Sequence, residues 1–187
     1  MQKRLDVYLS ENNTVKSRSL AASLIKQGSV EVNGRICTKA SFAVDENDNI
    51  RIIGEMPKYV GRGGLKLEKA LSHYRLHLDG SVCIDIGAST GGFTDCMLQN
   101  GAVKVYSVDV GTDQLDEKLR NDPRVVSMEK TDIRNCVGAL PAVDFIGIDV
   151  SFISLKLVLP SAYALLKDGG ECVALIKPQF EAGREKV

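Results

Sequence analysis

Apolar and polar residues follow a repeating pattern along residues 82–177. Strand-like apolar runs lie near 82–87, 103–109, 125–130, 144–150 and 171–177, and helical spacing occupies 92–99, about 112–120 and 155–167. Runs such as DFIGID and ECVALIK are apolar at nearly every position, which is typical of parallel strands covered on both faces. The pattern predicts an α/β fold built on a mostly parallel sheet.

The first 56 residues have a shorter and different pattern. LDVYL predicts a short helix, and Ser17 has the chemistry of an N-cap for a second helix, RSLAASLIKQ, which Gly28 ends. VEVNGRICTK has the pattern of a hairpin with Asn33 and Gly34 in its turn. We expect a small α+β domain at 1–56, a glycine-rich linker at 57–64 and a second domain at 65–187.

The most informative segment is residues 82–94, VCIDIGASTGGFT. A buried strand passes through glycines into a helix, so a ligand can approach backbone that carries no side chain. The helix N-terminus adds free N–H groups and a partial positive charge. This layout indicates a nucleotide-type cofactor site, although a tight turn alone would show the same glycines.

The acids around this loop indicate which cofactor it binds. Ser89 replaces the second glycine of the dinucleotide pattern, which disfavours an NAD-dependent oxidoreductase. Asp85 suits the ammonium and sulfonium of S-adenosylmethionine, and Asp109, 24 residues later, suits ribose hydroxyls. Asp132 follows the third strand. The candidate cofactor-binding residues are Asp85, Gly87, Ala88, Ser89, Gly91, Gly92, Phe93, Asp109 and Asp132.

A carboxylate and an amine follow the fourth and fifth predicted strands. Asp149 and Lys177 should open into the same crevice as the glycine loop, because parallel strands end at one edge of a sheet. A lysine with its ordinary pKa of ~10.4 holds its proton at neutral pH. Burial, or a second cation such as Lys66, would favour the neutral amine. Proton handling and a structural ion pair both remain open.

Composition narrows the class of protein. Hydrophobic residues make up 44% of the chain and charged residues 26%, which suits a globular core. No apolar run approaches the ~20 residues of a membrane span, and the N-terminus lacks the apolar core of a signal peptide. The five cysteines form no C-x-x-C pair, which favours reduced thiols in the cytoplasm. We expect no metal site, since His73 and His77 have no third ligand in view.

The net charge is zero, but the charges are unevenly distributed. Seven basic residues face three acidic ones in residues 1–39, and five face one in residues 58–75. Such basic patches attract phosphate backbones, although an ordinary solvated surface would also account for them.

Two resemblances make these expectations specific. The order helix, helix, GSV, VNG in residues 1–56 resembles the S-four-type RNA-binding domain, which implies RNA phosphate contacts at Arg4, Lys16, Arg18 and Lys26. The segments YVGRGGLKLEKAL, DIGASTGGFTDC, VDVG, IDVSFIS and LIKPQFEAGR resemble the TlyA (hemolysin A) family, which joins that domain to an FtsJ-like methyltransferase.

The second resemblance implies a Rossmann-like fold and 2′-O-methylation of ribose, at cytidine, in ribosomal RNA, with S-adenosylmethionine as cofactor and ribosomal subunits as partners. Lys66, Asp149 and Lys177 match the first three members of a catalytic Lys-Asp-Lys-Glu tetrad, and Phe152 matches an aromatic position beside the site.

The chain departs from the family at its C-terminal end. The resemblance places the tetrad glutamate beyond Val187, and Glu181 does not match it. Two further strands are also expected, so we expect a truncated sheet with an open edge, weak cofactor binding and slow methylation. An RNA-binding protein without catalysis and a membrane-active hemolysin remain alternatives, although no basic amphipathic helix supports the second.

Overall fold

The computed structural model describes residues 2–12, 14–15, 17–54 and 57–182. The chain forms two compact units, residues 1–58 and 59–187. Each unit has its own hydrophobic core. The division falls within the segment predicted as a linker, and Tyr59 is already buried in the second unit.

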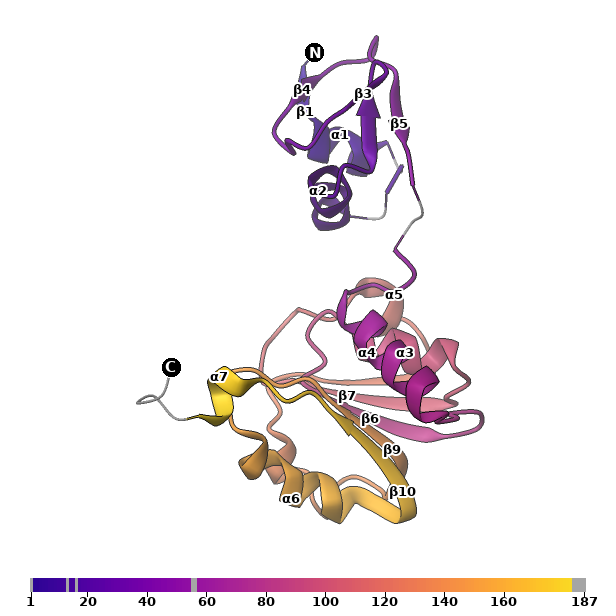
Figure 1. Ribbon diagram of the computed structural model, residues 1–187, viewed down its shortest axis with the longest axis vertical. Coiled ribbons are helices and arrows are strands. Elements are labelled where there is room, and N and C mark those ends of the chain that lie inside the picture. Colours follow the sequence, from indigo (N-terminus) through magenta and orange to yellow (C-terminus); the bar gives the residue numbers. More distant parts are fainter. Residues whose placement is uncertain (1, 13, 16, 55–56, 183–187) are drawn as a thin grey trace. The chain divides into compact units, whose positions relative to one another are not determined.

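The described residues of the first unit form two helices and two small antiparallel sheets (Figure 1). Its elements are β1 (Lys3–Arg4), α1 (Leu5–Glu11), α2 (Arg18–Lys26), β2 (Val30–Val32), β3 (Arg35–Ile36), β4 (Ala43–Val44) and β5 (Ile50–Ile52). Strand β1 pairs with β4, and β2 lies between β3 and β5. Leu5, Leu24 and Val30 are among the fully buried residues that join the helices to the strands.

The local predictions for this unit are confirmed. The Ser17 side chain accepts a hydrogen bond from Leu20 N at 3.2 Å, so it caps α2. Gly28, with φ of 76°, follows the end of α2. Asn33 and Gly34 both have positive φ and join β2 to β3, as a two-residue hairpin turn requires.

The second unit is a five-stranded parallel sheet in the order β10-β9-β6-β7-β8. Its elements are α3 (Gly63–Tyr74), β6 (Val82–Ile86), α4 (Gly92–Gln99), β7 (Lys104–Val108), α5 (Glu117–Arg120), β8 (Val125–Met128), η1 (Ile133–Asn135), β9 (Val143–Ile148), α6 (Leu155–Leu165), β10 (Leu166–Ala174) and α7 (Pro178–Glu181). Helices α3 and α4 cover one face and α6 covers the other (Figure 1). The expected α/β fold is confirmed.

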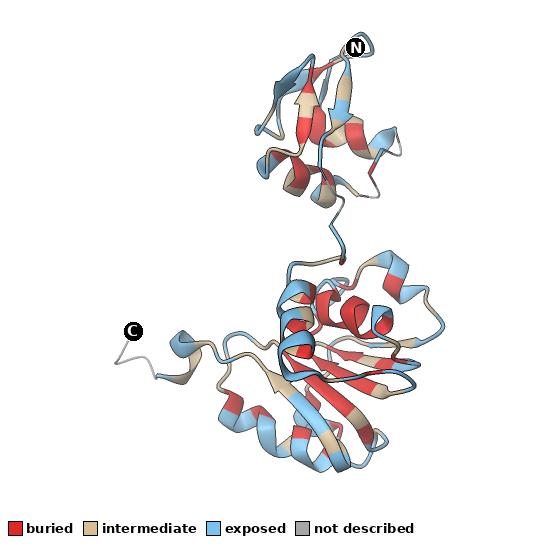
Figure 2. Ribbon diagram, turned by 45° about the vertical axis from the view of Figure 1, so that its right-hand side comes forward, coloured by how far each residue is buried: buried red, intermediate tan, exposed pale blue. Residues whose placement is uncertain are grey.

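Alternating side chains of the central strands build a core on each face of this sheet. Cys83 and Phe145 pack with α3 and α4, whereas Ile84 and Ile146 pack with α6. Figure 2 shows this burial along β6 and β9. Because both faces are covered, these strands need apolar residues at nearly every position.

The fifth strand differs from its prediction. Helix α6 ends at Leu165 rather than 167, and β10 begins at once, at Leu166. The pairing with β9 shifts register between Leu166 and Glu171, and the regular parallel ladder begins only at Glu171, near the predicted start. Strand β10 pairs with β9 alone, so it is an edge of the described sheet, and it is largely exposed (Figure 2).

The described helices are short. The expected helix at 112–120 is only α5, four residues long, because the left-handed Asp113 interrupts the backbone and Asp116 caps the helix through Lys118 N. Within the described ranges, no helix has the length and apolar character needed to cross a bilayer.

Candidate functional site

Three predicted residues meet at Asp149, which lies directly after β9. Lys177 Nζ lies 2.6 Å from Asp149 Oδ1, and Lys66 Nζ lies 3.2 Å from Asp149 Oδ2. Helix α3 supplies Lys66, and the segment between β10 and α7 supplies Lys177. The fold therefore brings together two amines and one carboxylate from three elements far apart in the sequence.

Lys177 has a second partner that the sequence analysis missed. Its Nζ donates a hydrogen bond to Ser151 Oγ at 2.8 Å. The contact of Lys177 Nζ with Asp149 Oδ1 is close, but its geometry is not that of a hydrogen bond. Asp149 therefore acts on the Lys177 amine through its charge, whereas the hydrogen bond to Ser151 orients the amine. The side chain of Lys177 is 21% exposed, so it is only partly buried.

Phe152 stands beside this group in an unusual conformation. Its φ is 66°, in the left-handed region that bulky side chains rarely adopt, and the residue is 91% exposed. Its ring lies 5.2 Å from the ring of Phe180 in α7. A strained backbone that presents an exposed aromatic ring is a feature of functional sites.

Glu181 has a structural contact. Its carboxylate accepts hydrogen bonds from Leu155 N at 2.8 Å and from Ser154 Oγ at 2.7 Å, at the start of α6. The Leu155 N–H, followed by the Ser154 hydroxyl, lowers the pKa of Glu181 below its ordinary value. Glu181 thus holds α7 to α6.

The glycine loop packs against the elements that carry these amines. A Cβ on Gly87, whose φ is 83°, would lie 2.9 Å from the carbonyl oxygen of Asp149. A Cβ on Gly92 would lie 2.9 Å from Gly64 N, at the start of α3. Glycine is therefore required at both positions for the loop to lie this close to Asp149 and to the helix of Lys66.

Asp85 lies beneath the loop and is fully buried. Its Oδ2 accepts hydrogen bonds from Thr94 N at 2.8 Å and Thr94 Oγ1 at 2.7 Å, and Thr94 Oγ1 also bonds with Ser107 Oγ. Among the described residues, Asp85 Oδ1 has no hydrogen-bond partner. Burial raises the pKa of Asp85 to about 7, although the Thr94 hydrogen bonds oppose the shift. Sequence reasoning identified Asp85 but not Thr94 or Ser107.

Asp109 holds the neighbouring turn. Its Oδ2 accepts from Ser89 N and its Oδ1 from Gly111 N, both at 2.7 Å. A small hollow of about 10 Å³, the space of about one water molecule, lies there. Its lining consists of Ala88, Ser89, Ser107, Asp109, Gly111, Gln114, Leu115, Ser127 and Glu129. Sequence reasoning missed Glu129 and Gln114, which no motif marks.

Two other candidates lie away from the hollow. Asp132 pairs with Arg134 at 2.6 Å and caps η1. Phe93 is buried in the core, where a Cβ on Gly147 would lie 2.8 Å from its ring. Roles for both in cofactor binding stay predictions.

The basic candidates of the first unit lie on or beside its helices. Arg4 and Arg18 both pair with Asp6, and both are about half exposed. Lys26 is exposed in the last turn of α2. Lys16 lies outside the described residues.

The parallel sheet has a glycine loop after one central strand, an acid after its neighbour and a Lys-Asp-Lys group after further strands, which fits a methyltransferase of the S-adenosylmethionine-dependent class. Residues 59–187 match the model of the FtsJ-like methyltransferase family, and residues 3–50 match the S4 domain. The chain therefore belongs to the FtsJ-like methyltransferase family, with an N-terminal S4 domain, as the sequence predicted.

Similar proteins share both units. YqxC of Bacillus subtilis is 48% identical over 100% of this chain and 67% of that protein. The 16S/23S rRNA (cytidine-2′-O)-methyltransferase TlyA of Mycobacterium tuberculosis is 40% identical over 98% of this chain and 70% of its own length. A solved Streptococcus thermophilus structure aligns with a TM-score of 0.73 at 48% identity, covering 100% of this chain and 70% of its own.

The residues at the loop fit S-adenosylmethionine, the cofactor of this class. Asp85 Oδ1, which has no hydrogen-bond partner among the described residues, is available beneath the loop, and Asp109 holds the Ser89 backbone at the edge of the hollow. Carboxylates suit the ammonium and the ribose hydroxyls of that molecule.

Proposed function

We propose that this chain methylates the ribose 2′-oxygen of cytidine in ribosomal RNA. The observation that carries the proposal is the convergence of Lys66 and Lys177 on Asp149 beside the glycine loop. The names of its relatives support the choice of ribosomal RNA and of cytidine.

The cofactor, when bound, supplies an electrophilic methyl group on a sulfonium. Ala88, Ser89 and Asp109 would hold it at the loop, with Asp85 beneath. The chain's own task is then to place a ribose hydroxyl in line with that methyl group, and positioning of this kind can lower a barrier by roughly 7–11 kcal/mol.

Lys177 Nζ is the proposed acceptor of the 2′-hydroxyl proton. Lys66 Nζ lies near the other oxygen of Asp149, so a second basic side chain stands at the same carboxylate as the accepting amine. Ser151 and Asp149 would hold the Lys177 amine in place, since both contact its Nζ. Lys66 would orient the hydroxyl, since its amine lies 3.2 Å from Asp149 Oδ2.

The exposed Phe152, next to Ser151, would offer an aromatic face to the target base. The S4 domain would hold folded RNA through Arg4, Arg18, Lys26 and Lys16. Because the proposed substrate is ribosomal RNA, we also infer ribosomal subunits as partners and a cytoplasmic site of action.

The test is tritiated-methyl transfer from S-adenosylmethionine to purified 30S and 50S bacterial subunits, followed by mapping of the label. We expect label on ribose, recognised because a 2′-O-methyl group blocks alkaline cleavage at that nucleotide. Lys69→Arg, on an exposed lysine of α3, is the matched control for Lys177→Arg. Label on a base, or equal transfer by the wild type and Lys177→Arg, would refute the proposal.

A further inference from the structure

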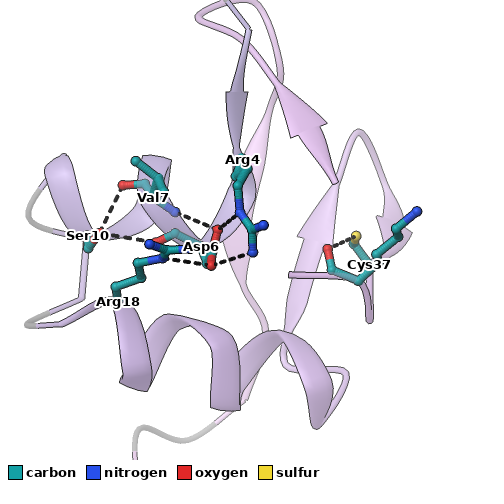
Figure 3. A network of polar contacts seen from close by, with 7 residues as sticks. Arg4, Asp6, Val7, Ser10, Arg18 and Cys37 are labelled. Atoms are coloured by element: carbon teal, nitrogen blue, oxygen red, sulfur yellow. Dashed lines mark hydrogen bonds and ion pairs between the residues drawn. The ribbon is translucent and has the colours of Figure 1, made fainter. Parts of the chain in front are cut away.

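Asp6, in the first turn of α1, joins two arginines that lie far apart in the sequence. Arg4 Nε and Nη2 donate to its two oxygens at 2.9 and 3.0 Å, and Arg18 Nε donates to Oδ2 at 3.0 Å. Figure 3 shows the carboxylate between the two guanidinium groups. Arg4 immediately precedes α1 and Arg18 begins α2, so one buried side chain connects both helix starts.

The Asp6 carboxylate has no free capacity. Val7 N donates to Oδ1 at 3.0 Å, so each oxygen accepts two hydrogen bonds, which fills its lone-pair positions. The side chain of Asp6 is 4% exposed, whereas those of Arg4 and Arg18 are 50% and 59% exposed. The arginine hydrogen bonds lower the pKa of Asp6 to about 2, so the carboxylate stays ionised at neutral pH.

Each arginine uses only part of its hydrogen-bonding capacity on Asp6. Arg4 Nη1 and both terminal nitrogens of Arg18 have no hydrogen-bond partner among the described residues. These N–H groups remain for a ligand outside the protein. A guanidinium whose direction is already fixed loses less side-chain entropy when it binds a phosphate.

We propose that Asp6 is a positioning residue for RNA binding. It holds Arg4 and Arg18 side by side, so that their outward N–H groups take phosphates of folded RNA at a fixed spacing. The inference rests on RNA binding by the S4 domain and not on methyl transfer. Asp6 is negatively charged, so its charge alone would weaken RNA binding.

The two explanations therefore predict opposite changes in RNA affinity when Asp6 is neutralised. If only the number of charges mattered, Asp6→Asn would tighten RNA binding, because it adds one positive charge to the net charge of the first unit. If the spacing of the arginines matters, the same change weakens binding to folded RNA, because the freed guanidinium groups must be ordered on binding. Flexible single-stranded RNA can adapt to the arginines and should show little loss.

The experiment uses the full chain and two probes, deproteinised 23S rRNA refolded in Mg²⁺ and single-stranded poly(U). For Asp6→Asn we expect about tenfold weaker binding to the folded rRNA, with a salt-dependence slope lower by about one. Binding to poly(U) should be unchanged or tighter. Glu46→Gln adds the same charge at an exposed loop position and should slightly tighten binding to both probes.

A second variant separates positioning from loss of folding. Arg18→Lys keeps the charge but cannot both pair with Asp6 and present a guanidinium, and it should weaken binding to folded rRNA about threefold. In the Asp6→Asn background, Arg18→Lys should reduce the affinity for folded rRNA much less, because the arginines are no longer held in fixed positions. A wild-type circular dichroism spectrum and melting curve would exclude unfolding as the cause.

The outcomes are distinct. If the wild type binds folded rRNA and Asp6→Asn binds it as tightly as Glu46→Gln does, the positioning role of Asp6 is wrong. RNA binding by the S4 domain would still stand in that case. Equal losses on folded rRNA and poly(U) would also overturn it, since a fixed spacing cannot matter to a flexible strand. If the wild type binds neither RNA, the proposed RNA binding by the first unit is itself wrong.

Discussion

Asp6 in the first unit and Asp149 in the second each lie between two basic side chains. Asp6 accepts three hydrogen bonds from Arg4 and Arg18, and Asp149 lies within 3.2 Å of Lys66 and Lys177. The two carboxylates therefore have the same number of cations but different kinds of cation. That difference matches the two tasks proposed for the chain.

Arginine presents a planar fork that stays charged, whereas lysine presents a single amine that can give up a proton. The arginines around Asp6 are suited to hold a phosphate without chemical change. The lysines around Asp149 are suited to a step in which one amine accepts a proton. Both carboxylates arrange cations, but only the lysine pair can change its total charge during a reaction.

Replacing the reacting amine by arginine tests this comparison most strongly. We expect Lys177→Arg to slow methyl transfer about 10²- to 10³-fold, because the guanidinium keeps the charge but does not accept the proton. RNA affinity should stay within twofold of the wild type. The measurement is single-turnover tritiated-methyl transfer with RNA in excess. Slowing of equal size by Lys69→Arg would show that the effect is not specific to this amine.

Asp85 extends the comparison to a carboxylate that accepts its hydrogen bonds from Thr94 rather than from a cation, and burial raises its pKa to about 7. Between about pH 4 and pH 7 the unfolded chain has lost this proton, whereas the folded protein still holds it. The free energy of unfolding should therefore fall as the pH rises through this window, by on the order of 4 kcal/mol.

Denaturant unfolding of the wild type and of Asp85→Asn at pH 4.5, 6 and 8 measures this effect. The variant cannot titrate at residue 85, so its stability should change less across the range. Parallel pH dependences for the two proteins would show that Asp85 does not titrate there.

Glu181 is a further carboxylate in this comparison. It accepts hydrogen bonds from uncharged donors at the start of α6, and these lower its pKa. Its stabilising contribution is present above the ordinary glutamate pKa and is lost as the pH falls through the lowered value. Glu181→Gln should lower the melting temperature of the second unit by about 3 °C at pH 7. The difference should shrink toward pH 3, and a constant difference would contradict a role for the charge.

Features fixed by neighbouring residues could be predicted from the sequence. The Ser17 cap, the Asn33-Gly34 turn and the order of strands and helices after residue 82 depend on short-range patterns. Asp149 and Lys177 were predictable as neighbours because parallel strands end at one edge of a sheet.

Features that depend on distant pairing were not predictable. Asp6 follows Arg4 by two residues and counted only as a charge, because its bond to Arg18 depends on how α1 packs on α2. Glu181 reaches Leu155 across 26 residues, and Ser151 reaches Lys177 across the same separation. Strands β1 and β4 have two residues each, too few for any periodicity to mark them.

The contact between Gly92 and the start of α3 has a consequence for how this protein can vary. A methyl group at residue 92 would meet Gly64 N at 2.9 Å and Gly61 O at 3.1 Å, so even alanine there would push α3 outward. Because Lys66 lies on α3, its amine would then move away from Asp149. The distance between the Lys66 and Asp149 side chains thus depends on a contact between glycines, and a substitution at that contact would impair the proposed methyl transfer without replacing any reactive residue.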